Sequence, residues 1–191
     1  MESKTIAAIT IFTALSVALV LSPLKFPAPY APFLKYQIWE IPIVAAFLLY
    51  GPLVGVAVSG INTLILLVVY PGDLPTGPLY NLAAVLSMLL GIYIIHKFAS
   101  GRFSRRQETI LTTFSTVLGS IARVGIMTVV NWAFLRYPYP VGYSIPEGAL
   151  TTMLPTIGLF NATLALYTIP LGYFISRAVI FGTNTTMWSQ R

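Results

Sequence analysis

The sequence predicts an all-α integral membrane protein, a compact bundle of six transmembrane helices with both termini in the cytoplasm. Its 191 residues are 57% hydrophobic and only 8% charged, whereas charged residues make up about a quarter of an ordinary soluble domain. Mean hydropathy is +0.82. The apolar stretch from Ile38 to Tyr70 is too long for one crossing of a bilayer, which needs about 20 apolar residues. A helical bundle suits this composition because it satisfies its backbone hydrogen bonds internally.

The Gly51-Pro52 pair divides the long apolar stretch into two helices. Glycine accepts the dihedral angles of a tight turn, and proline suits the first turn of the helix that follows. The second helix is short for a crossing, so either it begins earlier, near Pro32, or the membrane thins around it. Pro170 should bend the last helix because proline removes a backbone donor. The chain is expected to form a single domain over residues 1–191, with helices at Thr5–Ser22, Gln37–Tyr50, Pro52–Tyr70, Pro78–Phe98, Thr109–Leu135 and Leu150–Phe181.

The distribution of basic residues orients the bundle. Six crossings place both termini on one side, and the opposite side carries only Lys25, Lys35 and Arg136. By the positive-inside rule the termini are cytoplasmic, and the protein is a multi-pass protein of the cell membrane. The basic segment from His96 to Arg106 is interpreted as a topology anchor near anionic lipid, with His96 at the surface, and no motif for reading nucleic acid accompanies it. The cytoplasmic basic residues are Lys4, Lys97, Arg102, Arg105, Arg106, Arg177 and Arg191.

Two loops on the outer side, residues 23–39 and 136–148, are rich in proline and aromatic residues. Proline favours an extended, polyproline-like course. Aromatic side chains stack on flat rings and also sit well at the lipid headgroups. Two interpretations stay open, namely an interfacial aromatic belt and a lid over a pocket that opens outward.

No pattern in the sequence predicts catalysis or metal binding. Cysteine is absent, and there is no metal-ligand spacing, no nucleophile-base arrangement and no nicotinamide or P-loop glycine motif. We therefore expect a protein that is not an enzyme and that does not itself hydrolyse ATP.

Polar residues inside the apolar helices are the candidates for function, since they are costly in lipid. Arg123 either makes a structural ion pair or contacts a ligand, and Glu40 either faces water or hydrogen-bonds a ligand donor. Asparagine amides both donate and accept, so they suit the edge of a heteroaromatic ring. Asn81, Asn131 and Asn161 lie toward the outer parts of three helices and are placed to converge there. The alternative for each asparagine is a hydrogen bond between helices.

In these residues the chain resembles the substrate-binding S components of energy-coupling factor (ECF) vitamin transporters, and above all their riboflavin-binding branch. The similarity extends over nearly the whole chain as six helices. It consists of Ala14 and Ala18 in the first helix, EIPIVAAFLLYGPLVG at residues 40–55, NLAA at 81–84, VVNW at 129–132 and LFN at 159–161.

The resemblance implies a division of labour among subunits. Such S components capture a vitamin from outside and pass it inward with a membrane coupling protein and two cytoplasmic ATPase subunits. The resemblance further implies that Ala14 and Ala18 face the coupling protein, that the first outer loop is a gate, and that Asn131 and Asn161 contact the flavin. The riboflavin branch tends to place a lysine one turn after the second of these asparagines, where this chain has Ala-Thr-Leu.

We therefore predict a high-affinity vitamin-binding subunit of an ECF importer, with riboflavin as the transported ligand and no other cofactor. The alternatives are another vitamin (pyridoxine, thiamine or a precursor) and, from a different class, an independent secondary transporter. Ligand pockets combine apolar and aromatic walls with a few polar groups that fix orientation. The predicted ligand-binding residues are Tyr36, Trp39, Glu40, Asn81, Asn131, Trp132 and Asn161.

Overall fold

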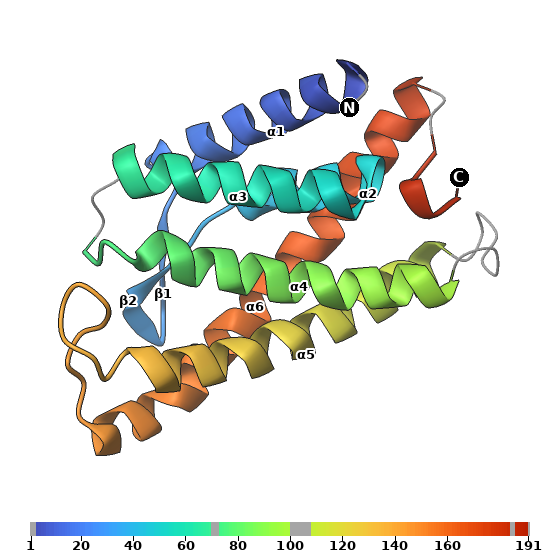
Figure 1. The fold of residues 1–191 in the computed structure, drawn as a ribbon. Coiled ribbons are helices and arrows are strands. Elements are labelled where there is room, and N and C mark those ends of the chain that lie inside the picture. Colours follow the sequence, from blue (N-terminus) through green and yellow to red (C-terminus); the bar gives the residue numbers. More distant parts are fainter. Residues whose placement is uncertain (1–2, 70–72, 100–107, 184–185, 191) are drawn as a thin grey trace.

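The structure, a computed structural model, describes residues 3–69, 73–99, 108–183 and 186–190. Within these residues it contains six α-helices and one antiparallel pair of strands (Figure 1). Successive helices run in alternating directions, and the marked N and C ends lie at the same end of the bundle. The elements are α1 (Ser3–Leu21), β1 (Phe26–Ala28), β2 (Ala31–Tyr36), α2 (Glu40–Tyr50), α3 (Pro52–Val69), α4 (Gly77–Ala99), α5 (Glu108–Phe134), α6 (Glu147–Thr183) and the 3-10 helix η2 (Trp188–Gln190).

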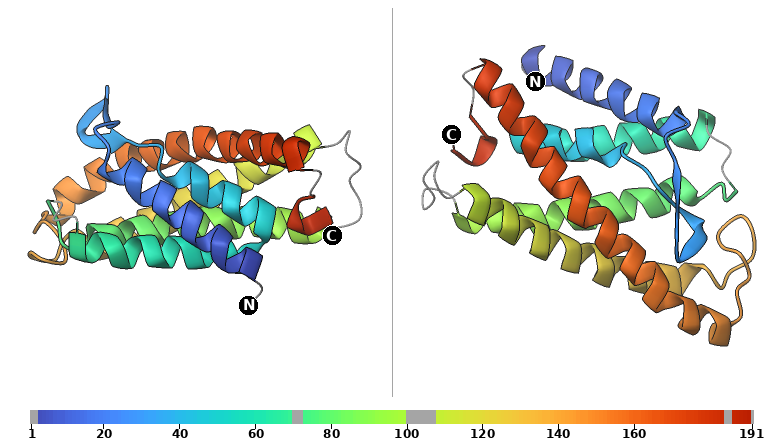
Figure 2. Two further views of the ribbon diagram at one scale, coloured as in Figure 1. Left: turned by 90° about the horizontal axis from the view of Figure 1, so that it is seen from above. Right: turned by 180° about the vertical axis from the view of Figure 1, so that it is seen from behind.

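Five of the described helices, α1, α3, α4, α5 and α6, are long and apolar enough to cross a membrane. Helix α2 differs, because its 11 residues span only about 16 Å. It begins three residues later than predicted, since residues 37–39 form the bend that connects strand β2 to it. Every residue of α2 from Glu40 to Leu49 is buried, as expected of a helix that is hydrophobic all round. It lies in the core of the bundle, packed against α1, α3 and α6 (Figure 2).

The predicted turn between the second and third helices is confirmed. Gly51 closes α2 with φ 101°, a value that residues with a Cβ rarely adopt. Its N–H donates to Phe47 O at 2.9 Å, and α3 begins at once with Pro52.

Glycines let neighbouring helices approach closely, as small residues do in membrane bundles. A Cβ added to Gly91 of α4 would lie 2.6 Å from the Cα of Gly119 in α5. A Cβ added to Gly172 of α6 would lie 2.4 Å from Val44 Cγ1 in α2. These contacts bring α4 against α5 and α2 against α6, the pairings that surround the polar residues described below.

Helix α6 is longer than predicted, with 37 residues from Glu147 to Thr183. Its length of about 56 Å exceeds the roughly 30 Å of bilayer hydrocarbon, and it crosses the bundle diagonally (Figure 2). The helix continues through Pro155 and Pro170. A bend at Pro170 stays a prediction.

The first outer loop forms a β-hairpin, so the expected polyproline-like course is wrong for residues 26–36. Phe26 pairs with Tyr36 and Pro27 with Lys35, and the ladder is irregular after Pro27. Proline is compatible with this hairpin because a two-stranded sheet consists only of edge strands, where a missing donor costs little.

The interpretation of His96 as a surface residue is also wrong, because its side chain is 0% exposed. Its Nε2 hydrogen-bonds the Tyr173 hydroxyl, and its Nδ1 lies 2.7 Å from Ser189 Oγ. The indole of Trp188 stacks on the imidazole with ring centroids 5.9 Å apart. The segment that contains η2 folds back onto the end of α4 and covers the histidine, a long-range contact that local sequence does not reveal. The rest of the basic segment, residues 100–107, lies outside the described residues.

Candidate functional site

A buried ion pair joins α2 to α5 in the interior of the bundle. Arg123 Nη2 donates to Glu40 Oε1 at 2.8 Å, and Nη1 donates to Glu40 Oε2. Glu40 is 3% exposed and Arg123 is 2% exposed. Two opposite charges in such a place are tolerable because they neutralise each other in a bidentate geometry. Of the alternatives open in the sequence, Glu40 does not face water, and Arg123 makes the ion pair.

The ion pair extends to α6 and α4. Arg123 Nε donates to Asn161 Oδ1 at 3.1 Å, and Nη1 lies 3.7 Å from Met88 Sδ. Asn161 in turn donates through Nδ2 to Ile157 O, 2.9 Å away and one turn earlier in α6. Four helices are thus tied together at one buried polar cluster, which we call the ion-pair cluster: Glu40, Met88, Arg123 and Asn161.

The three predicted recognition asparagines differ in their surroundings. Asn131 in α5 and Asn161 in α6 are buried, at 7% and 5% exposed. Asn131 Nδ2 donates to Met127 O at 2.6 Å. Asn81, near the start of α4, is exposed. The structure therefore buries Asn131 and Asn161 but leaves Asn81 at the surface, and a role for each in ligand binding stays a prediction.

The two predicted tryptophans also differ. Trp39 is buried at the start of α2 within the hydrophobic core, and its carbonyl accepts a hydrogen bond from Ser16 Oγ at 2.8 Å. Trp132 is 43% exposed, and the Arg136 guanidinium lies over its ring at 4.0 Å. Trp132 offers an accessible ring face near the C-terminal end of α5, whereas the Trp39 ring packs in the hydrophobic core.

Tyr36 fastens the hairpin to α6. Its hydroxyl lies 2.8 Å from Thr163 Oγ1 and 2.6 Å from the Tyr30 hydroxyl. Its ring lies 5.1 Å from that of Phe160, centroid to centroid. Burial raises the pKa of Tyr36 above its ordinary value of 10.0, so the phenol stays protonated and can donate. Sequence reasoning did not single out Thr163, which one hydroxyl in a helix does not distinguish from its neighbours.

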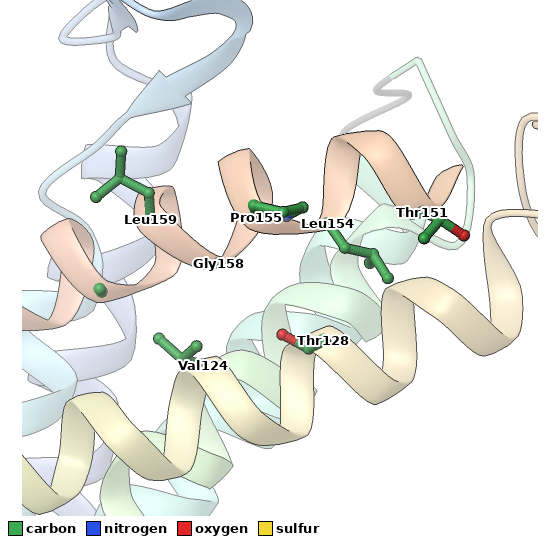
Figure 3. Close-up of a pocket in the computed structure, with 8 residues that line it drawn as sticks. Val124, Thr128, Thr151, Leu154, Pro155, Gly158 and Leu159 are labelled. Carbon is green, nitrogen blue, oxygen red and sulfur yellow. The ribbon is translucent and has the colours of Figure 1, made fainter. Parts of the chain in front are cut away.

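A groove with a cavity volume of about 510 Å³ runs between α5 and α6. Val124 and Thr128 project from α5 toward the α6 residues that form its other wall (Figure 3). Its size falls within the range of small-molecule sites. The lining is mainly apolar, with two threonines: Val124, Thr128, Thr151, Leu154, Pro155, Gly158, Leu159 and Ala162. The sequence reasoning missed this groove, although Gly158 and Ala162 are small residues four apart in α6.

The hairpin contacts α6 beside the groove. Tyr36 contacts Phe160 and Thr163, and Thr163 lies one helical turn after Leu159, which lines the groove. The residues that line the groove itself belong to α5 and α6. The role of the hairpin as a gate stays a prediction.

The small residues of the first helix face outward. Ala14 and Ala18 are exposed, whereas Thr13 and Ser16 on the same helix are buried against the bundle. Exposed small residues permit another helix to approach closely. The structure is thus compatible with the contact that the resemblance implies.

Comparison with known proteins identifies the class of fold. The chain superimposes on the solved structure of the S component of a bacterial ECF transporter with a TM-score of 0.74, 22% identity, and coverage of 95% of this chain and 98% of that one. No family model matches the chain. The fold is that of an ECF S component, a multi-pass membrane protein.

Two relatives give a more particular likeness. The chain is 28% identical over 140 residues to the riboflavin transporter RibU of Staphylococcus aureus (strain TCH60), which covers 73% of this chain and 70% of RibU. It is 29% identical over 128 residues to the riboflavin transporter FmnP of Bacillus subtilis (strain 168), covering 65% of this chain and 63% of FmnP, less than two thirds of that protein. The predicted resemblance to riboflavin-type S components is confirmed. Both relatives are transporters, which supports the prediction that the chain is not an enzyme.

Proposed function

We propose that this chain is the riboflavin-binding S component of an ECF-type importer. The observation that carries the proposal is the sequence similarity to two riboflavin transporters in a chain with the S-component fold. The chain captures the vitamin from outside the cell as one domain over residues 1–191. It then associates with a membrane coupling protein and two ATPase subunits that supply the energy.

In this proposal all six helices lie in the membrane and both termini are cytoplasmic. The two ends of the chain lie at one end of the bundle (Figure 1), and Lys4, Lys97 and Arg177 are basic residues of that end. Basic residues favour the cytoplasmic side. Helix α2 does not cross the bilayer alone, and the hairpin before it completes the passage from the outer surface.

The ligand lies in the outer half of the bundle, where α5 and α6 carry Asn131 and Asn161. Those amides can orient the polar edge of a flavin ring. The neighbouring groove has the volume and the apolar lining that such a ring requires. Trp132 of α5 and Tyr36 of the hairpin, which packs against α6, supply aromatic surface. Among the described residues no group of three or more His, Cys, Asp or Glu side chains is placed to hold a metal ion.

Titration of riboflavin with detergent-purified protein tests the proposal. Flavin fluorescence should be quenched on binding, because tryptophan and tyrosine rings stack against the isoalloxazine. Pyridoxine and thiamine serve as competitors in the same assay. Unquenched riboflavin together with tight binding of either competitor would transfer the chain to another vitamin branch. Riboflavin transport by the chain alone in liposomes would instead indicate an independent carrier.

The contact with the coupling protein has its own test. Ala14→Leu or Ala18→Leu places a bulky side chain on the exposed small surface of α1 and should block riboflavin uptake in cells. Riboflavin binding by the purified variants should be unchanged, since neither residue contacts the interior. Normal uptake by both variants would show that α1 is not the coupling surface.

A further inference from the structure

The guanidinium of Arg123 has a second task besides neutralising Glu40. Its Nη1 and Nη2 groups are directed at the carboxylate, whereas Nε donates at 3.1 Å to the side-chain oxygen of Asn161. The flat fork of an arginine fixes the relative directions of these bonds. One residue therefore sets the position of both the carboxylate and the amide.

The orientation of the Asn161 amide follows from simple chemistry. A guanidinium can only donate, so the amide atom that faces it must be the oxygen. The carbonyl of Ile157 can only accept, so the atom that faces it, at 2.9 Å, must be the nitrogen. An inverted amide would place N–H against N–H and oxygen against oxygen. Two buried partners thus hold the amide of Asn161 in one orientation.

This orientation limits what Asn161 can offer to a ligand. One N–H of Nδ2 is committed to Ile157, and one N–H remains. The second lone pair of Oδ1 lies beside a cation, which makes it a poor acceptor for a further neutral donor. Asn161 is accordingly a hydrogen-bond donor toward any ligand.

Asn131 provides the contrast on the facing helix. Its Nδ2 donates to Met127 O at 2.6 Å, and no described cation contacts its oxygen. Its Oδ1 is free to accept. The two asparagines of the outer half therefore present unlike groups, a donor from α6 and an acceptor from α5.

We propose that Arg123 is a positioning residue for ligand specificity, which holds the Asn161 oxygen so that the amide donates to an acceptor atom of the ligand. The inference rests on the proposed function and deepens it. The ligand that fits carries a ring carbonyl or ring nitrogen opposite Asn161. Asn131 lies eight residues beyond Arg123, about 12 Å along α5, so the N–H opposite Asn131 belongs to a separate part of the ligand. Because Glu40 neutralises Arg123, the site presents no net charge and suits an uncharged ring.

Arg123→Lys separates positioning from simple charge pairing. Lysine keeps the positive charge and can pair with Glu40, but its single ammonium group does not reproduce the arginine fork that also reaches Asn161. If Arg123 serves only to neutralise Glu40, this variant should behave like the wild type. The second variant, Glu40→Gln with Arg123→Gln, removes both charges and the arginine fork together, and it keeps the test available if Arg123→Lys does not fold.

The first measurement needs no ligand. In protein labelled with ¹⁵N-asparagine, the side-chain NH₂ signals of Asn161, assigned by their loss in Asn161→Ala, should shift in Arg123→Lys. The signals of Asn131 should stay in place and act as the internal control. Unchanged Asn161 signals would overturn the positioning role.

The second measurement compares riboflavin with analogues that weaken one acceptor each, namely 2-thio-, 4-thio- and 5-deazariboflavin. Arg123→Lys should bind riboflavin about 10-fold more weakly, the effect of one hydrogen bond. The wild type should bind one analogue more weakly than it binds riboflavin, whereas Arg123→Lys should bind that analogue and riboflavin equally well. This coupling is expected when the arginine and the altered ligand atom act on the same hydrogen bond. Equal weakening for all four ligands would overturn the proposal. Wild-type protein that binds none of them, with the Asn161 signals shifted as expected, would refute riboflavin as the ligand and leave the amide orientation standing.

Discussion

The two ends of the bundle differ in how their polar groups are paired. Following the proposed orientation, we call the end that carries both termini the inner end and the opposite end the outer end. At the inner end, four polar side chains form one connected series. Ser189 contacts His96, His96 contacts Tyr173, and the Tyr173 hydroxyl donates to Ser115 Oγ at 2.8 Å. In the outer half, Asn131 and Asn161 use only part of their hydrogen-bonding capacity. Spare capacity in a buried amide is costly in lipid, so the outer asparagines are the better candidates for ligand recognition.

Apolar packing reinforces this difference. At the inner end, Trp188 stacks on Tyr93 with centroids 6.1 Å apart and meets the ring of Phe47 edge-on. Met187 beside it is fully buried. The α5–α6 groove of about 510 Å³ lies instead toward the outer half. The inner end is closed by the protein's own segment, whereas the outer half retains space along α5 and α6.

Breaking the ion-pair cluster should have the largest effect. Arg123→Met leaves Glu40 buried without a counter-charge, and loss of one partner of a buried pair costs about 3–5 kcal/mol. We expect a much lower unfolding temperature in detergent and little folded protein. The measurement is thermal unfolding followed by circular dichroism or by size-exclusion chromatography after heating.

Glu40→Leu combined with Arg123→Met is the matched control. It removes both charges, and a buried pair replaced by apolar residues of similar size is often neutral for stability. The double variant should regain most of the lost stability. If it stays as unstable as Arg123→Met, repacking rather than charge determines the loss.

The helices could be predicted from sequence because apolar length and the Gly51-Pro52 turn are local signals. Which helices pack against one another could not be predicted in this way. A short α2 in the core, with Glu40 facing Arg123 across 83 positions of sequence, depends on which helices pack together. The burial of His96 has the same origin, since Ser189 lies 93 positions away. Local charge patterns near His96 therefore suggested a surface that the C-terminal segment covers.

Replacement of tryptophan at the two ends gives the next largest effect. Trp188→Ala removes stacking on Tyr93 and His96 and should lower the free energy of unfolding by about 2 kcal/mol, less than full burial would give because the residue is half-buried. Riboflavin affinity should change little. Trp132→Ala, at an exposed position of the outer half, should instead weaken riboflavin binding and change the free energy of unfolding little. Equal losses of affinity in both variants would contradict the separation of the two ends.

Substitution of single asparagines should have smaller effects on binding. Asn131→Ala and Asn161→Ala each remove one proposed ligand contact and should weaken riboflavin binding by about 10-fold. Asn62→Ala is the control, because Asn62 lies on α3, which packs mainly against α1, α2 and α4 rather than against α5 or α6. The control should bind riboflavin normally. Weaker binding by Asn62→Ala than by the other two would move the site away from α5 and α6.

The candidate site could be predicted only in part for a related reason. The residue types were informative, because asparagine in an apolar helix is costly and both Asn131 and Asn161 are buried. The direction of each side chain could not be predicted, since Asn81 is also an asparagine at a similar predicted depth but is exposed. Trp39 shows the same limit, because its ring belongs to the core. Residue type suggests a chemical role, and packing decides which residues can perform it.

The smallest effect concerns the hairpin, whose Tyr36 and Tyr30 hydroxyls contact Thr163 of α6. Tyr36→Phe keeps the ring against Phe160 but removes the contacts with Thr163 and Tyr30, worth about 1 kcal/mol. If the hairpin is a gate, the weaker attachment should raise the rates of riboflavin association and dissociation together and change the affinity little. Stopped-flow fluorescence separates the two rates. Thr163→Val removes the same contact from the α6 side and should reproduce the result, whereas unchanged rates in both variants would indicate that the hairpin does not control access.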